Sequence, residues 1–75
     1  MRIVVQVEED RDGMFAAFSD DIKGVYGQGT SVSTALADFL RGLATLIEYR
    51  QETAQPIEIE EVLVAKNEPS QTTTT

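Results

Sequence analysis

One segment of this 75-residue chain constrains its fold more than any other: a single apolar stripe at helical spacing. Apolar residues recur every three or four positions between Val32 and Ile47, which predicts one amphipathic helix. Ser31 is a favourable N-cap residue, and we expect the helix to end by residues 50–52. Because this stripe needs a second apolar surface to cover it, the rest of the chain must supply a sheet.

Four other segments have the composition and alternation of β-strands. The first alternates between apolar and polar residues, with Val4 as the exception. Asp12-Gly13 predicts a hairpin turn into the second. The expected strands cover residues 2–8, 14–19, 25–29 and 57–65.

The third segment contains two glycines, Gly27 and Gly29, whose positions fall on the same face of a strand. Either a helix packs closely over them or the strand bulges there. A phosphate-binding loop is the weaker reading, because the third glycine and the lysine of the known fingerprints are missing.

The alternation of the last strand slips, because Ile57 and Ile59 have one parity and Val62 and Val64 the other. One extra residue near Glu60-Glu61, as in a β-bulge, would restore the phase.

These elements predict one α+β domain over residues 1–66: a two-layer β-β-β-α-β fold, an antiparallel sheet with one helix packed on it. Residues 67–75 have no apolar anchor and are expected to form a flexible tail. A core this small is marginal alone, and the last strand leaves an edge. We therefore expect a homodimer or higher homo-oligomer, formed through that strand or through the exposed helix face.

Composition narrows the function. The chain has 13 acidic and 6 basic residues, a net charge of −7, and no His, Cys or Trp. A Ser-His or Cys-His nucleophile pair and a tetrahedral zinc site are therefore excluded. The acidic charge disfavours nucleic acid as a ligand and favours a basic partner. We expect no enzyme activity, no cofactor and no metal.

No segment resembles a signal peptide or approaches the length of a membrane span, so we expect a cytoplasmic protein.

A calcium-binding loop and a two-metal nuclease site are the two metal-dependent alternatives to this expectation. Residues 8–13 carry acids at alternate positions before a glycine, as a calcium loop does, but position twelve of that loop would be Ser19. A solvated hairpin loop is the simpler interpretation. A two-metal nuclease needs acids that converge on one pocket, and most of the acids here lie in loops or on outward faces.

A partner-binding surface is the remaining interpretation of the acids. We expect it to use two loop acids and three outward acids of the last strand: Asp20, Asp21, Glu58, Glu60 and Glu61. Taken singly, each of these acids is more simply interpreted as a solvated surface carboxylate. Tyr26 and Tyr49 could mark an interface or be half-buried tyrosines with hydrated hydroxyl groups.

Three short motifs follow one another in residues 12–36. The first, Asp/Gly-Gly-aromatic-x-Ala, is matched at Gly13, Phe15 and Ala17. The second, Asp-Leu-Pro-Gly, is matched by residues 21–24, with Lys23 in place of the proline. The third, Gly-x-Thr-x-x-x-Ala-Leu, is matched at Gly29, Ser31, Ala35 and Leu36. In this order and spacing, the chain resembles the HicB-type antitoxin family.

That resemblance implies a partial ribonuclease-H-like fold without catalysis. It also implies a partner: a small basic HicA-like toxin, an RNA-cleaving protein with a double-stranded-RNA-binding-like fold, whose active site the antitoxin covers. Family members usually carry a C-terminal DNA-binding module, and nothing after residue 65 matches one, so direct DNA binding is not expected. The alternative is a solitary HicB-like interaction or inhibitor protein that acts on another basic or nucleic-acid-binding protein.

Overall fold

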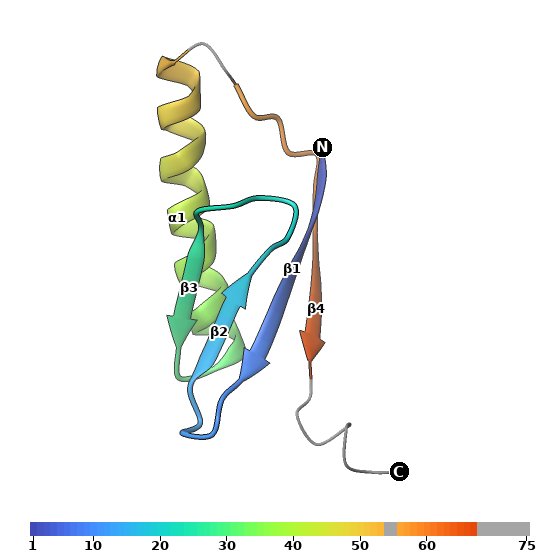
Figure 1. Ribbon diagram of the computed structural model, residues 1–75, viewed down its shortest axis with the longest axis vertical. Coiled ribbons are helices and arrows are strands. Elements are labelled where there is room, and N and C mark those ends of the chain that lie inside the picture. The colour runs from blue at the N-terminus through green and yellow to red at the C-terminus, as the bar shows by residue number, and fades with distance from the viewer. Residues whose placement is uncertain (54–55, 68–75) are drawn as a thin grey trace.

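The chain forms a four-stranded sheet with one helix packed on one of its faces (Figure 1). The computed structural model describes residues 1–53 and 56–67. The helix is α1 (Val32–Glu52). The strands are β1 (Arg2–Glu9), β2 (Phe15–Phe18), β3 (Tyr26–Gly29) and β4 (Glu61–Asn67).

The predicted two-layer α+β fold with the order β-β-β-α-β is confirmed. Asn67, which we expected to begin the tail, is the last residue of β4. The rest of the expected tail, residues 68–75, lies outside the described residues.

The sheet is mixed, with the strand order β3-β2-β1-β4, and the expectation of an antiparallel sheet is wrong for the last strand. β1 pairs antiparallel with β2 but parallel with β4, from Arg2↔Glu61 to Glu8↔Asn67. The cause is α1, which carries the chain from the end of β3 back to the end of the sheet where β1 begins (Figure 1). β4 therefore starts beside the start of β1 and runs in the same direction.

One extra residue lies just before β4. Met1 lies opposite Ile59 in the ladder. Its amino group donates a hydrogen bond to the carbonyl of Glu58 (2.8 Å), and its carbonyl accepts one from the NH of Glu60 (2.9 Å). The next residue of β1, Arg2, pairs with Glu61. Glu60 is therefore additional between the two pairings, as the sequence predicted.

The extra residue brings Ile59 and Val62 to the same face despite their opposite parity. Ile59 packs against the core, and Val62 lies beside the buried Ile3. The expected strand over residues 57–65 is wrong at both ends, because residues 57–60 are irregular and the regular strand continues to Asn67.

Ser31 caps α1, as predicted. Its side chain accepts a hydrogen bond from the Thr34 NH (3.1 Å), and the Thr34 hydroxyl accepts one from the Ser31 NH (3.0 Å). This reciprocal pair satisfies donors that the first turn of a helix leaves free. At the other end, the Thr53 NH donates to the Tyr49 carbonyl (3.1 Å) and closes the last turn.

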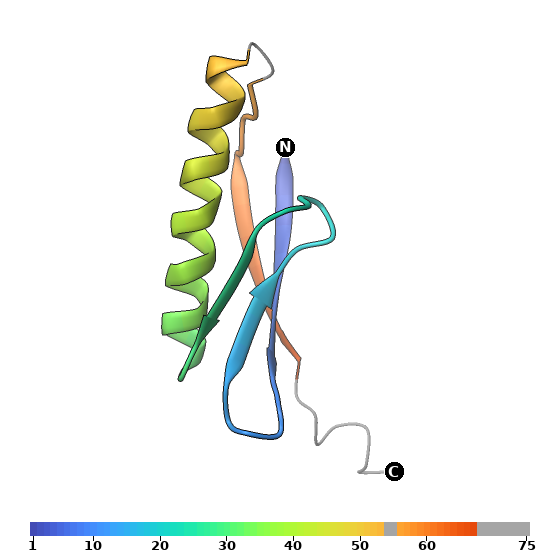
Figure 2. The ribbon, with the colours of Figure 1, turned by 60° about the vertical axis from the view of Figure 1, so that its left-hand side comes forward.

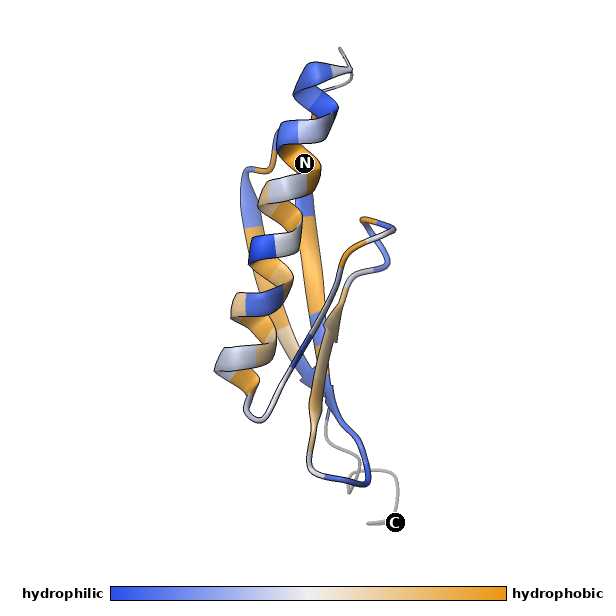
Figure 3. Cartoon of the chain, turned by 90° about the vertical axis from the view of Figure 1, so that its left-hand side faces the viewer, coloured by the Kyte–Doolittle hydropathy of each residue, from blue (hydrophilic) through white to orange (hydrophobic). Residues whose placement is uncertain are grey.

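The core lies between α1 and the face of the sheet that it covers (Figure 2). Alternate residues of β1 are fully buried against the apolar stripe of the helix, whose hydrophobic and hydrophilic positions alternate around its axis (Figure 3). The central buried residues are Ile3, Val5, Val7, Ala17, Ala35, Phe39 and Leu43.

The two glycines of β3 allow α1 to approach the sheet. A Cβ on Gly27 would lie 2.9 Å from the Phe39 Cα and closer still to other helix backbone atoms. A Cβ on Gly29 would lie 2.6 Å from the Ala35 nitrogen. Of the two explanations offered for this pair, close packing of the helix is confirmed.

Gly27→Ala is expected to lower the free energy of unfolding by about 1–3 kcal/mol, because the new methyl group meets helix backbone that cannot move aside. Urea unfolding measures the change.

Gly42→Ala is the matched control. There the new Cβ meets only the side chain of Val25, at 3.3 Å, and the helix gains about 1 kcal/mol in propensity. Equal losses in both variants would contradict this account of the β3 glycines.

Asp38 of α1 fixes the helix to the outer strand of the sheet. Its carboxylate accepts from the backbone NH of Gln28 in β3 (3.0 Å) and from the Arg41 guanidinium (2.8 Å). The hydrogen bond from Arg41, and then the one from Gln28, lower the pKa of Asp38 below its ordinary value.

Because folding lowers the pKa of Asp38, this carboxylate stabilises the fold above its unfolded pKa, and the stabilisation is lost as the pH falls through the folded pKa. Asp38→Asn is therefore expected to be less stable than the wild type at pH 7, and the difference should shrink in acid. Urea unfolding of both proteins at several pH values measures it.

Asp12→Asn is the control, because the Asp12 carboxylate accepts no hydrogen bond from the described residues. The same pH dependence in that variant would contradict the role given to Asp38.

Candidate protein-binding surface

The sheet has one face that α1 does not cover, and we call it the open face. Its members follow from the register. On each strand, the residues in register with the buried β1 residues point to the helix, and the residues between them point away from it. The open face consists of Arg2, Val4, Gln6, Glu8, Ala16, Phe18, Tyr26, Gln28, Glu61, Leu63, Ala65 and Asn67.

Large apolar side chains lie uncovered on the open face. Tyr26 is 58% exposed, Leu63 is 46% exposed and Val4 is 38% exposed. Val4 and Leu63 are direct neighbours in the register, and Phe18, next to Tyr26, is half-buried. A grouping of this kind is typical of a surface that binds another protein.

The sequence contains a signal for this surface. Val4 is the exception to the alternation of the first strand, and it places an apolar residue on an otherwise polar face. Tyr26, a possible interface residue by its type, lies on the same open face and is exposed. Tyr49 is also exposed, but it belongs to α1 and not to the open face.

The two loop acids lie beside β1, in the connection between β2 and β3. An Asp21 carboxylate oxygen accepts a hydrogen bond from the backbone NH of Val4 (2.8 Å). An Asp20 carboxylate oxygen accepts one from the side-chain amide of Gln6 (3.2 Å). β2 pairs with β1 only from Gln6 onward and does not reach Val4. Asp21 therefore accepts the hydrogen bond from the Val4 NH that a neighbouring strand would otherwise accept.

The three remaining acids lie on the other side of β1. The Glu61 carboxylate pairs with the Arg2 guanidinium at 3.2 Å, and the Glu60 carboxylate pairs with the amino group of Met1 at 3.4 Å. Glu58 contributes its carbonyl oxygen to that amino group. The expectation that Glu58 and Glu60 are the outward half of the last strand is wrong, because both precede β4.

All five predicted acids therefore contact residues 1–6, which comprise Met1 and the first half of β1, from two sides. We call this set the β1 acids: Asp20, Asp21, Glu58, Glu60 and Glu61. Each is exposed, which leaves its carboxylate within reach of a partner. The β1 acids flank the end of the open face that contains Val4.

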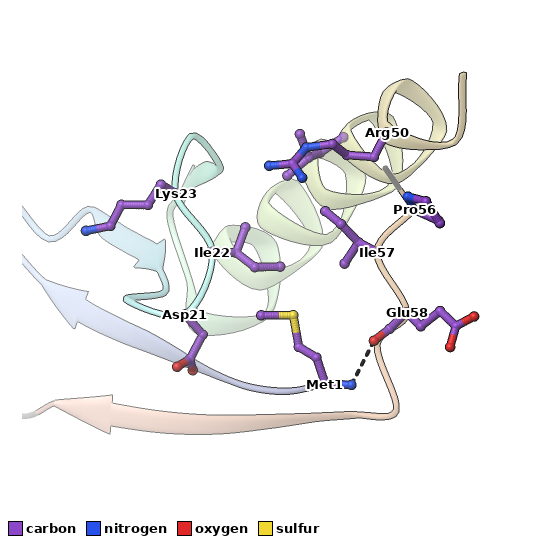
Figure 4. A pocket seen from close by; sticks show the side chains of 9 residues that line it. Met1, Asp21, Ile22, Lys23, Arg50, Pro56, Ile57 and Glu58 are labelled. Atoms are coloured by element: carbon purple, nitrogen blue, oxygen red, sulfur yellow. Dashed lines mark hydrogen bonds between the residues drawn. The ribbon is translucent and has the colours of Figure 1, made fainter. Parts of the chain in front are cut away.

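A cavity of about 450 Å³ opens at the same end of the molecule (Figure 4). It lies between the last turns of α1, the loop after β2 and the chain before β4. The side chains of Met1, Ile22 and Ile57 converge in it, whereas those of Asp21 and Lys23 extend away from it (Figure 4). The lining is mixed, because Arg50 and Glu58 line the cavity together with these apolar side chains.

The acidic loop between β1 and β2 uses its central carboxylate internally. Asp10 accepts hydrogen bonds from the backbone NH groups of Asp12 (2.8 Å) and Met14 (3.0 Å), while Gly13 adopts a positive φ of 82°. This is the geometry of a hairpin turn. Within residues 1–53 and 56–67, no three acidic side chains are arranged to hold a metal ion.

Asp21→Ala is expected to speed amide hydrogen exchange at Val4 and to lower the free energy of unfolding by about 1 kcal/mol, because a backbone donor loses its acceptor. NMR-detected exchange measures the first effect.

Asp20→Ala is the matched control, since its carboxylate accepts only from the Gln6 side chain. Unchanged exchange at Val4 in the Asp21 variant would show that this hydrogen bond does not hold the strand.

In the described part of the chain, no helix combines the length and apolar content needed to cross a membrane. Comparison with known proteins gives no relative: no family model, no curated protein and no solved structure matches this chain.

Proposed function

We propose that this chain is a non-catalytic, acidic protein-binding module that resembles a HicB antitoxin and acts in the cytoplasm. Its partner is a small basic RNA-cleaving protein, a HicA-like toxin, which it neutralises by covering the active site. The motif order in residues 12–36 suggests the family, and the surface described above supports a binding role.

The observation that carries the proposal is the combination of the open face with the β1 acids. The open face exposes large apolar side chains, and the β1 acids add carboxylates at one of its ends. An apolar centre with a charged rim is the usual anatomy of a protein interface. The acids match a basic partner, because complementary charges steer the encounter and orient the complex.

The same surface supports a second candidate, an inhibitor or adaptor for a different basic or nucleic-acid-binding protein. Lys23 favours it, because a lysine stands there in place of the proline of the family's Asp-Leu-Pro-Gly motif. This substitution lies in the loop that carries Asp20 and Asp21, so the contact surface itself departs from the family pattern.

Co-expression with a HicA-like toxin tests the first candidate. We expect a stable complex in which the toxin no longer cleaves RNA. Asp20→Lys combined with Glu58→Lys should raise Kd about tenfold at low salt, with a smaller effect at high salt, because exposed charges are screened. Calorimetric titration at two salt concentrations measures both changes. Neither carboxylate accepts a backbone hydrogen bond among the described residues, so the fold should survive.

Glu48→Lys is the matched control. Glu48 is an exposed acid of α1, away from the open face. It should leave Kd nearly unchanged. If no complex forms, the antitoxin proposal is wrong. A different basic protein recovered from the native host, with an affinity sensitive to the same two substitutions, would establish the second candidate.

A further inference from the structure

β4 is an edge strand that is apolar on both faces. Val62 is 36% exposed, Leu63 is 46% exposed and Val64 is 47% exposed. β1 covers one edge of this strand, and α1 lies over β2 and β3 instead. A long apolar edge strand readily pairs with another chain unless something blocks it.

The other edge of the sheet is blocked. β3 has only four residues, two of which are glycines, and its Gln28 NH donates to Asp38 of the helix. On β4, by contrast, no side chain among residues 1–53 and 56–67 hydrogen-bonds to the backbone of Val62, Leu63 or Val64. The two edges thus differ in how they are protected, and β4 is the one open to pairing.

The register shows which backbone groups face outward. Val4 directs its NH away from β4, to Asp21, so Ile3 and Val5 direct theirs toward β4. In a parallel ladder, a residue whose NH and carbonyl face the neighbouring strand forms hydrogen bonds with the residues on either side of its register partner. The partners of Ile3 and Val5 are Val62 and Val64, so Ile3 and Val5 both bond to Leu63. The NH and carbonyl groups of Val62 and Val64 consequently point to the outer edge.

We propose that a second copy of this chain pairs with that edge, antiparallel, about a two-fold axis at Leu63. Val62 of each copy then exchanges both backbone hydrogen bonds with Val64 of the second copy. Leu63 faces Leu63 of the second copy across the axis, on the open face. The two sheets become one eight-stranded sheet.

Side-chain chemistry selects this register over its neighbour. With the axis at Leu63, Val62 lies opposite Val64 and Leu63 lies opposite Leu63, so apolar residues pair with apolar residues. With the axis at Val64, Val62 would lie opposite Lys66 and lose its apolar neighbour. Cross-strand side-chain pairs are the unit of sheet stabilisation, so the register that pairs apolar side chains is favoured.

Pairing also joins the two open faces into one continuous surface. A partner bound as proposed above could therefore meet two symmetric copies of its site. The dimer itself needs no partner, so it can be tested without any toxin, and its failure would leave the binding proposal intact.

Disulfide trapping tests the register, because the chain contains no cysteine. Leu63 would lie in a non-hydrogen-bonded antiparallel pair, whose Cα atoms are about 4.5 Å apart, within reach of a disulfide. We expect Leu63→Cys to form a covalent dimer under mild oxidation. Val64→Cys, equally exposed but opposite Val62, and Tyr26→Cys, on the other edge strand, should cross-link far more slowly. Equal rates in all three variants would overturn the proposal.

Measurement of the molecular mass completes the test. Sedimentation of the wild type should give a dimer. Leu63→Lys, which places like charges at the axis on an already exposed position, should give a folded monomer by circular dichroism. A monomeric wild type at high concentration would refute the proposal, as would a Leu63→Lys variant that remains as dimeric as the wild type.

Discussion

The rest of the structure depends on the close contact between β3 and the backbone of α1. Gly27 and Gly29 carry no side chains, so Ala35 and Phe39 approach the strand more closely than any Cβ would allow. Phe39 is thereby placed over the sheet and buried completely beside Ile3, Val5 and Val7 of β1. The absence of side chains at Gly27 and Gly29 sets the position of the helix as much as its apolar stripe does.

This contact also explains why the two sides of the molecule differ. A helix held over β2 and β3 blocks the β3 edge through Asp38 but does not extend over β4. The apolar residues of β4 remain exposed, and within residues 1–53 and 56–67 no helix covers the opposite face of the sheet. One helix is too little to cover four strands, so surface suited to other proteins is a direct result of the fold.

Local signals in the sequence predicted the elements that depend on local interactions. Ser31 marked the start of the helix, and the parity change between Ile59 and Val62 indicated the extra residue that the hydrogen bonds of Met1 now locate at Glu60. The parallel direction of β4 was missed, because strand direction depends on where a helix ends in space. The gathering of the acids around β1 was also beyond sequence reasoning, since the bond from Asp21 to Val4 joins two distant segments.

The pairing of the first strand with the last bears on how the protein is made. On the ribosome, β1 is synthesised before its parallel neighbour β4, and more than fifty residues separate the two strands. At typical translation rates this delay is roughly 3–12 s. Throughout that interval the β4 side of β1 has no partner within its own chain, and Ile3 and Val5 lack part of their cover. During that interval the unpaired edge of β1 is open to pairing with another nascent chain.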